Sequence, residues 1–283
     1  MNEKELNSIE QIIKRAGEMI LSARPRGEEV HRKTGPANFV TDYDVKLQEY
    51  LIRSLSGVLP GAQYFGEEET EGNTHGGEEG YVFFIDPIDG TTNFMFDYHN
   101  SCVSVGLGRD GTLIAGWVYD PYKDQLYSAV KGQGAYLNGE RLYLKDLALN
   151  SGICAFGCAR YNEGDRIFEI LRKLFMHSLA IRNGGSSAID LCRIASGSNV
   201  GYIEMKLQPY DYAAASVILT EAGGVISQAD GSGITLDRGC SVIAGTPKAY
   251  EEIKELAAGL TDEQQLAFAL TDERQLAETG LKE

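Results

Sequence analysis

The stretch YVFFIDPIDGTTNF, residues 81–94, constrains this chain more than any other feature. Residues 81–85 form a continuous run of aromatic and β-branched side chains, which is typical of a strand buried on both faces. Proline has no N–H group for a strand ladder, so the sequence predicts that Pro87 ends the strand. Asp86 then lies at the carboxyl end of the strand, and Asp89 lies in the turn that follows.

Two aspartates three positions apart at a strand end allow two interpretations. An Asx-turn followed by a helix cap at Thr91 or Thr92 accounts for an isolated D-P-x-D pattern. A metal site is the alternative, because two carboxylates brought together repel each other unless a cation joins them. Oxygen ligands without histidine or cysteine suit Mg²⁺ or Mn²⁺ better than zinc. The complete string DPIDGTTNF after a buried strand favours the metal site.

Composition limits the classes of protein to which the chain can belong. Its 283 residues, 43% of them hydrophobic, suffice for one large domain or two ordinary ones. A net charge of −15 argues against nucleic acid or an anionic membrane as a partner. The five cysteines are scattered without CxxC spacing, as expected of reduced thiols in a cytoplasmic protein. The sequence shows no signal-peptide pattern and no apolar run of membrane-spanning length.

The first part of the chain, residues 1–145, is predicted to be an α+β subdomain. Apolar side chains recur at helical spacing over residues 6–20, and a second helix is expected to start near Asp44. Hairpin signals at 108–112, 119–124 and 136–142 predict an antiparallel meander.

The second part, residues 146–258, is predicted to be an α/β subdomain because helices and strands alternate along it. Helices are expected at 165–178, 186–197, 211–224 and 247–260, and strands at 200–205, 224–228 and 241–245. Residues 259–283 contain the near-repeat LTDEQQLAFA and LTDERQLAET, which predicts a helical C-terminal extension.

Further acidic residues occur near the predicted ends of elements. The stretch FVTDYD contains Asp42 and Asp44, FGEEE contains Glu67, and a predicted helix opens with Asp211. Asp42 is interpreted as the cap of the second helix, and Glu68 and Glu69 as solvated loop charges. The four histidines lack ligand spacing and are assigned no role in metal binding.

With these motifs in order, the chain resembles the inositol monophosphatase superfamily of metal-dependent, lithium-sensitive sugar phosphatases. The resemblance covers residues 5–258 and rests on RKTGPANFVTDYD, GEE, DPIDGTTNF, GAYLNG, IRNGGSSAIDLCRIASG and YIEM…YDYAAAS…EAGG. It implies a mixed α+β and α/β fold, the layered αβαβα sandwich of the inositol monophosphatase/fructose-1,6-bisphosphatase type. It also implies two to three Mg²⁺ ions per active site, with Mn²⁺ as a substitute, and a homodimer.

The resemblance implies a role for each matched residue. A first Mg²⁺ is expected on Glu67, Asp86 and the carbonyl of Ile88, a second on Asp86, Asp89 and Asp211, and a third, weaker one on Glu67. Asp44, Glu67 and Thr91 are expected to activate the attacking water. The N–H groups of Gly90 and Thr91 are expected to receive the phosphate, next to Asp89 and Asp211. Gly185, Ser186 and Glu204 are expected to hold sugar hydroxyls.

Some positions depart from the family pattern. Tyr210 stands where relatives usually have tryptophan, and Ser187 replaces an alanine. Cys158 stands where inositol-specific relatives often have serine, and residues 96–105 lack the usual proline and aromatic. We therefore expect an intact metal site and an adjusted sugar pocket.

The expected function is Mg²⁺-dependent hydrolysis of a small phosphorylated polyol or sugar, with inositol monophosphate as the first choice. Fructose-1,6-bisphosphate is the alternative substrate, and other sugar or nucleotide phosphates are hydrolysed on the same fold. A non-catalytic binding or regulatory protein is a further alternative, which the loss of a metal ligand would favour.

Overall fold

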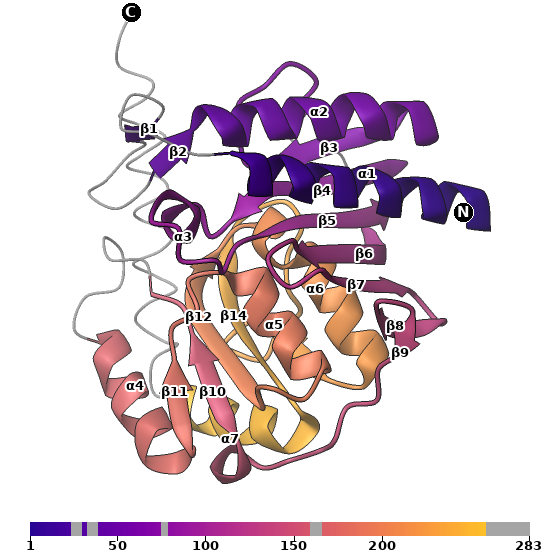
Figure 1. Ribbon diagram of the computed structural model, residues 1–283. Helices are drawn as coiled ribbons and strands as arrows, with labels where there is room; N and C mark the ends of the chain where they lie inside the picture. The colour runs from indigo at the N-terminus through magenta and orange to yellow at the C-terminus, as the bar shows by residue number, and fades with distance from the viewer. Residues whose placement is uncertain (24–29, 33–38, 75–78, 159–165, 259–283) are drawn as a thin grey trace, which may run out of the picture.

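A computed structural model describes residues 1–23, 30–32, 39–74, 79–158 and 166–258 of the chain (Figure 1). Helices α1 (Glu3–Ser22) and α2 (Asp42–Val58) cover the outer face of one sheet. Helices α5 (Ser187–Ala195) and α6 (Pro209–Ala222) lie between this sheet and a second one. Helices α4 (Arg166–His177) and α7 (Pro247–Ala257) pack on the far side of the second sheet. The expected αβαβα layering is confirmed.

The first sheet has seven strands in the order β3-β4-β5-β6-β7-β8-β9. Its bounds are β3 Gln63–Gly66, β4 Tyr81–Asp89, β5 Cys102–Arg109, β6 Thr112–Asp120, β7 Gln125–Val130, β8 Gly134–Leu137 and β9 Glu140–Arg141. Strand β3 runs parallel to β4, and every later pair is antiparallel, so the meander is confirmed. A two-stranded sheet, β1 (Val30–Arg32) and β2 (Phe39–Thr41), precedes α2, and the short helix α3 (Thr91–Met95) follows β4.

The second sheet has five strands in the order β11-β10-β12-β14-β13. Its bounds are β10 Ile153–Phe156, β11 Ala180–Arg182, β12 Gly201–Leu207, β13 Val225–Ser227 and β14 Cys240–Gly245, and a 3₁₀ turn at Leu149–Ser151 precedes β10. Strand β10 is parallel to both neighbours, whereas β14 is antiparallel to β12 and β13. One buried cluster contains side chains from both sheets and from α5 and α6. The division into subdomains at residue 145 stays a prediction.

Helix α6 lies directly against the first sheet because two strand positions there are glycines. A Cβ atom on Gly116 of β6 would come within 2.2 Å of the Ala214 carbonyl oxygen, and one on Gly106 of β5 within 2.8 Å of the Ala213 Cβ. The helix is apolar on nearly all sides, as a helix enclosed between two sheets must be. This close packing sets the position of Asp211 in the first turn of α6.

Two local predictions around the motif were wrong. Strand β4 continues through Pro87 to Asp89, because the ladder with β5 shifts register between Asp86 and Asp89 and the proline falls within this irregularity. The cap of α3 is Gly90, in the left-handed conformation (φ 91°), and Thr91 is already helical.

The second helix is capped by Thr41 and not by Asp42. The Thr41 hydroxyl accepts a hydrogen bond from the Tyr43 N–H, and Asp44 completes the capping box. Asp42 is the first residue of the helix.

Two further predictions depend on which residues are described. Among the described residues, no helix is both long enough and apolar enough to cross a membrane. The predicted extension at 259–283 lies outside the described residues. All five cysteines are reduced thiols, as expected.

Candidate active site

Five acidic residues from four elements form what we call the carboxylate cluster: Asp44, Glu67, Asp86, Asp89 and Asp211. Asp44 and Asp211 lie in the first turns of α2 and α6, Glu67 directly follows β3, and Asp86 and Asp89 lie on β4. The exposed fractions of Asp44, Asp86 and Asp89 are 0%, 3% and 7%. Carboxylates are rarely buried to this degree unless a partner compensates their charge.

Each aspartate of the carboxylate cluster has one oxygen held by hydrogen bonds from nearby groups. The donors are the N–H and hydroxyl of Thr41 to Asp44 Oδ2, the Ile88 N–H to Asp86 Oδ1, the Ser186 hydroxyl and Ala188 N–H to Asp89 Oδ2, and the Gln208 N–H to Asp211 Oδ2. The donor–acceptor distances are between 2.5 and 3.0 Å. These bonds fix the orientation of the four carboxylates before any ligand arrives.

Burial and mutual repulsion raise the pKa values of Asp86, Asp89 and Asp211. Burial, followed by the charges of Glu67, Asp89 and Asp211, holds the pKa of Asp86 well above its usual value. Burial also raises the pKa of Asp89 from 3.8 to about 7, against the lowering effect of its hydrogen bonds. The pKa of Asp211 is raised by burial and then by the charge on Asp89. Such a cluster carries its full negative charge most readily with cations bound.

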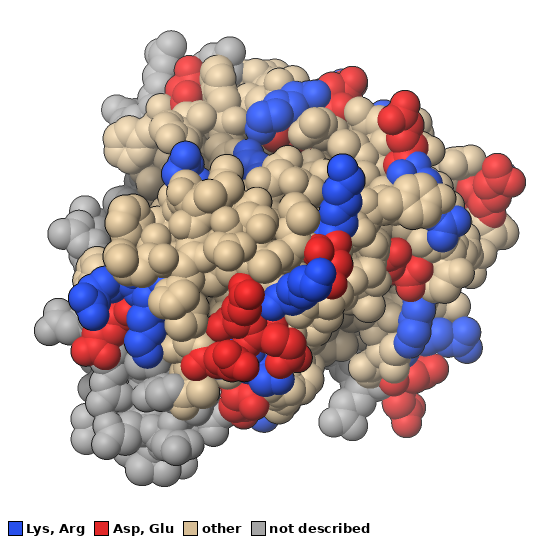
Figure 2. Space-filling view, turned by 90° about the horizontal axis from the view of Figure 1, so that it is seen from below, with Lys and Arg blue, Asp and Glu red and all other residues tan. Residues whose placement is uncertain are grey.

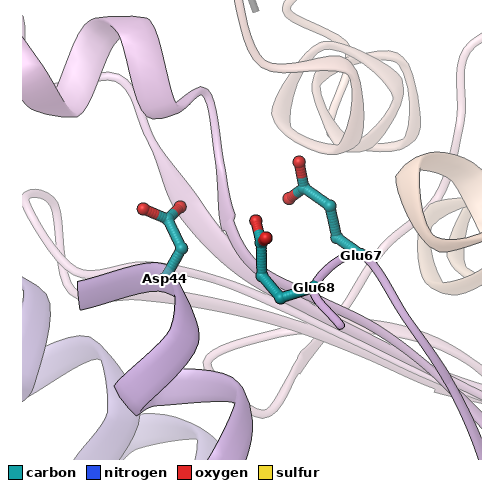
Figure 3. Close-up of side chains that lie close together, drawn as sticks. All are labelled: Asp44, Glu67 and Glu68. Atoms are coloured by element: carbon teal, nitrogen blue, oxygen red, sulfur yellow. The ribbon is translucent and has the colours of Figure 1, made fainter. Parts of the chain in front are cut away.

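A second acidic group overlaps the first, as Figure 3 shows. One oxygen each from Asp44, Glu67 and Glu68 lies within 4.8 Å of the others. Glu68 is only 5% exposed, so its interpretation as a solvated loop charge was wrong, whereas Glu69 is exposed as expected.

The position of Glu68 follows from its contacts with α2. The Gln48 side chain accepts a hydrogen bond from the Glu68 N–H (2.9 Å) and donates one to the Glu68 carbonyl oxygen (2.5 Å). Gly66 leaves room for this contact, since a Cβ there would lie 2.4 Å from Gln48 Oε1. In the sequence, the only indication that Glu68 is buried is Gln48, a glutamine on the otherwise apolar face of the predicted second helix.

The Thr91 hydroxyl joins α3 to the carboxylate cluster. It lies 3.2 Å from Asp44 Oδ1 and 3.2 Å from the Ile88 carbonyl oxygen. Gly90 beside it has no room for a side chain, because a Cβ would lie 2.9 Å from the Gly185 carbonyl oxygen. Thr91, Ile88 and Gly90 therefore lie beside the carboxylate cluster, and the roles that the resemblance implies for them stay predictions.

The residues expected to hold sugar hydroxyls belong to the second part of the chain, and two of them lie close to members of the carboxylate cluster. Gly185 has a positive φ of 71° and is packed against Asn93. Ser186 caps α5, and its hydroxyl donates to Asp89 at 2.7 Å. Glu204 on β12 accepts a hydrogen bond from the Tyr202 hydroxyl and is close enough to Asp211 to help raise its pKa.

A network of hydrogen bonds that the sequence did not suggest connects the first part of the chain to the second part. Asn93 and Asn100 both donate to the Gly184 carbonyl oxygen, at 2.8 and 2.7 Å. Arg193 donates to Asn100 Oδ1 at 2.7 Å and forms an ion pair with the buried Asp190. Asn100 lies in residues 96–105, the stretch that departs from the family pattern. Its hydrogen bonds connect this stretch of the first part of the chain to Gly184 and Arg193 in the second part.

The donor set fits a hard divalent cation. The carboxylate cluster offers oxygen atoms only, three of its five members are buried, its four aspartates are held in orientation by hydrogen bonds, and the carboxylates repel one another when ionised. Mg²⁺ and Mn²⁺ prefer such ligands.

Comparison with known proteins agrees with this geometry. Residues 1–266 match the model of the inositol monophosphatase family. The inositol-1-monophosphatase of Bacillus subtilis (strain 168) is 34% identical over 245 residues, which cover 86% of this chain and 92% of the relative.

Solved structures give the same result. The extragenic suppressor protein suhB of Bartonella henselae aligns with a TM-score of 0.83 at 28% identity, covering 90% of this chain and 98% of the other. A structure of SaIMPase-II with inositol monophosphate bound aligns with a TM-score of 0.77 at 27% identity, covering 94% and 98%. This chain belongs to the inositol monophosphatase family, whose members depend on metal ions, and it is a phosphoric monoester hydrolase.

Proposed function

We propose that this enzyme hydrolyses the phosphate monoesters of small polyols or sugars, with inositol monophosphate as the preferred substrate and Mg²⁺ as the cofactor. The observation that carries the proposal is the carboxylate cluster, whose members Asp89 and Asp211 lie close to Ser186 and Glu204. Every position to which the resemblance assigns a metal ligand has the expected residue, which disfavours a non-catalytic binding protein.

Glu67, Asp86 and the Ile88 carbonyl would hold one Mg²⁺, and Asp86, Asp89 and Asp211 a second. Bound Mg²⁺ would neutralise the phosphate, lower the pKa of a bound water and stabilise the leaving alkoxide. Ser186 and Ala188 keep Asp89 in place for this role through their hydrogen bonds to Oδ2.

The chain itself would orient the water and the phosphate. The Thr91 hydroxyl can donate to Asp44 Oδ1, 3.2 Å away, which leaves its oxygen to accept a hydrogen bond from the attacking water. As the water attacks, its proton would pass to the Thr91 oxygen while the Thr91 proton passes to the Asp44 carboxylate. Glu67, within 4.8 Å of Asp44, would accept the other hydrogen bond from that water. The N–H groups of Gly90 and Thr91 would receive the phosphate. No covalent nucleophile is required.

The substrate class is tested by measuring phosphate release in Mg²⁺ from a panel of esters. The panel contains inositol monophosphate, fructose-1,6-bisphosphate, a nucleoside monophosphate and p-nitrophenyl phosphate. We expect kcat/KM to be highest for inositol monophosphate. Preference for fructose-1,6-bisphosphate would favour the alternative, and no release from any ester would contradict the proposal.

The proposal includes a cytoplasmic location and no nucleic-acid partner. The net charge of −15 supports the absence of a nucleic-acid partner, since binding to nucleic acid requires a basic surface. On the face shown in Figure 2, acidic and basic side chains of the described residues are interspersed. Filter binding with duplex and single-stranded DNA and RNA at low salt would test the absence of a nucleic-acid partner. We expect that the protein retains no nucleic acid on the filter.

We further propose a homodimer. Exposed apolar side chains directly after α3, on α4 and directly after α4 support this: Phe96, Tyr98, Phe168, Phe175, Met176 and Leu179, which are 62–75% exposed. Helices α3 and α4 lie on the same side of the molecule (Figure 1), and large exposed apolar patches commonly mark interaction surfaces. Light scattering should give twice the 30.9 kDa chain mass, and Phe175→Ser should reduce it to the mass of one chain. A monomeric wild type would contradict this part of the proposal.

A further inference from the structure

The Glu204 carboxylate is held by a buried tyrosine two residues earlier on the same strand. Residues i and i+2 of a strand lie on one face, so Tyr202 and Glu204 are neighbours on β12. The Tyr202 hydroxyl donates to Glu204 Oε2. Tyr202 is 1% exposed, and burial raises the pKa of its hydroxyl further, so the group remains protonated and can donate.

A glycine encloses the same carboxylate from the neighbouring strand. Gly157 directly follows β10, and its N–H donates to the Ile203 carbonyl oxygen at 3.0 Å. A Cβ on Gly157 would lie 2.0 Å from Glu204 Oε2 and 2.3 Å from Cδ. Its φ lies outside the range that favours glycine, so what glycine provides here is space: a side chain at this position would displace the Glu204 carboxylate.

From these two contacts we infer that Tyr202 and Gly157 are positioning residues that set the affinity of the enzyme for polyol hydroxyls through Glu204. This inference rests on the proposed function, in which Glu204 accepts hydrogen bonds from those hydroxyls. A glutamate side chain free to rotate would lose conformational entropy when a substrate binds. Tyr202 and the space at Gly157 hold the carboxylate in one orientation beforehand, at the edge of the carboxylate cluster.

The test compares two esters with four single variants. Tyr202→Phe removes the donor and keeps the ring, and Gly157→Ala introduces the clash. We expect each to raise KM for inositol monophosphate ~3- to 10-fold (tenfold corresponds to ~1.4 kcal/mol), with kcat nearly unchanged. KM for p-nitrophenyl phosphate, which offers no hydroxyls to Glu204, should not change.

Matched controls come from the same part of the chain. Tyr250 is a buried tyrosine whose hydroxyl lies 2.8 Å from Ser227 Oγ, so Tyr250→Phe also removes a tyrosine hydrogen bond. A Cβ on Gly233 would have no neighbouring atom within 4 Å, so Gly233→Ala adds a methyl group without a clash. Neither control should change KM for either ester, and thermal unfolding of all four variants would reveal any general loss of stability.

Variants of Glu204 separate the inference from the proposed function. Glu204→Gln should raise KM for inositol monophosphate selectively, and Tyr202→Phe should then have no further effect in that background, because both act through one carboxylate. A selective effect of Glu204→Gln without any effect of Tyr202→Phe and Gly157→Ala would overturn the inference and leave the function standing. Equal losses on both esters, or additive losses in the double variant, would also overturn it. No effect of Glu204→Gln on either ester would overturn the proposed hydroxyl contact as well.

Discussion

The burial of Asp89 predicts that the metal-free enzyme is made less stable by its own active site. Burial raises the pKa of Asp89 from 3.8 to about 7, and at ~1.4 kcal/mol per pKa unit this difference corresponds to ~4 kcal/mol of unfolding free energy. Because the folded-state pKa is the higher one, this stability is fully present below about pH 3.8 and is lost as the pH rises through 7. Metal-free protein at pH 8 therefore carries the whole penalty.

Asp89→Asn tests this reasoning directly. The amide oxygen can still accept from Ser186 and Ala188, but the position no longer ionises. In EDTA at pH 8 the variant should exceed the wild type in unfolding free energy by up to ~4 kcal/mol, which is on the order of 5–10 °C in Tm. The difference should be small at pH 4.5. Turnover should be nearly abolished, because a ligand shared by the proposed metal site is lost.

Thermal unfolding with and without Mg²⁺ completes the assay. A ligand at 100 times its Kd stabilises a protein by ~2.7 kcal/mol, so saturating MgCl₂ should raise the Tm of the wild type at pH 8 clearly more than that of Asp89→Asn. Asp237→Asn is the control, because Asp237 is exposed beside Arg238, and it should behave as the wild type. Equal Tm values for wild type and Asp89→Asn in EDTA at pH 8 would refute the reasoning, as would normal turnover of the variant.

Four further predictions follow from other contacts and motifs. Ser186→Ala removes the 2.7 Å hydrogen bond to Asp89, so a Mg²⁺ titration of turnover should show half-maximal activity at a severalfold higher concentration, and an unchanged titration would count against the bond. Asn100→Ala removes the hydrogen bonds to Gly184 and from Arg193 and should lower the unfolding free energy in urea by ~2–3 kcal/mol, whereas a loss below ~0.5 kcal/mol would show that the network does not stabilise the fold. Truncation after Ala258 should leave kcat/KM unchanged, since every motif of the resemblance lies before that residue, and lost turnover at unchanged Tm would contradict this. Lithium chloride at tens of millimolar should inhibit turnover, as the family resemblance implies, and full activity would reject that analogy.

The layered fold could be predicted from the sequence because its strongest signals are local. The apolar run at 81–85, the helical spacing at 6–20 and the hairpin turns each determine an element within a short window. The end of β4 could not be predicted in the same way. Whether a proline ends a strand depends on the register of the neighbouring strand, and β5 accommodates Pro87 within an irregular ladder.

The candidate site shows the same division between local and distant causes. Asp44, Asp86, Asp89 and Asp211 stand out in sequence because each lies at the end of an element. Glu68 does not, because its burial depends on Gln48, which lies twenty positions earlier and pairs with its backbone. The network of Asn100, Gly184 and Arg193 joins positions more than 80 residues apart, a distance over which residue spacing carries no signal.

The packing of α6 against Gly106 and Gly116 has a consequence for folding during synthesis. The hydrogen bond between Asp89 and Ala188 closes a loop of 99 residues, and contacts this distant in sequence form late in folding because their loop-closure entropy is large. An N-terminal fragment that ends before Ser186 would contain four members of the carboxylate cluster but neither Asp211 nor the groups that hold Asp89. During synthesis, the protein therefore acquires its complete set of ligands only after the ribosome has passed Asp211 and the helix has docked on the two glycines.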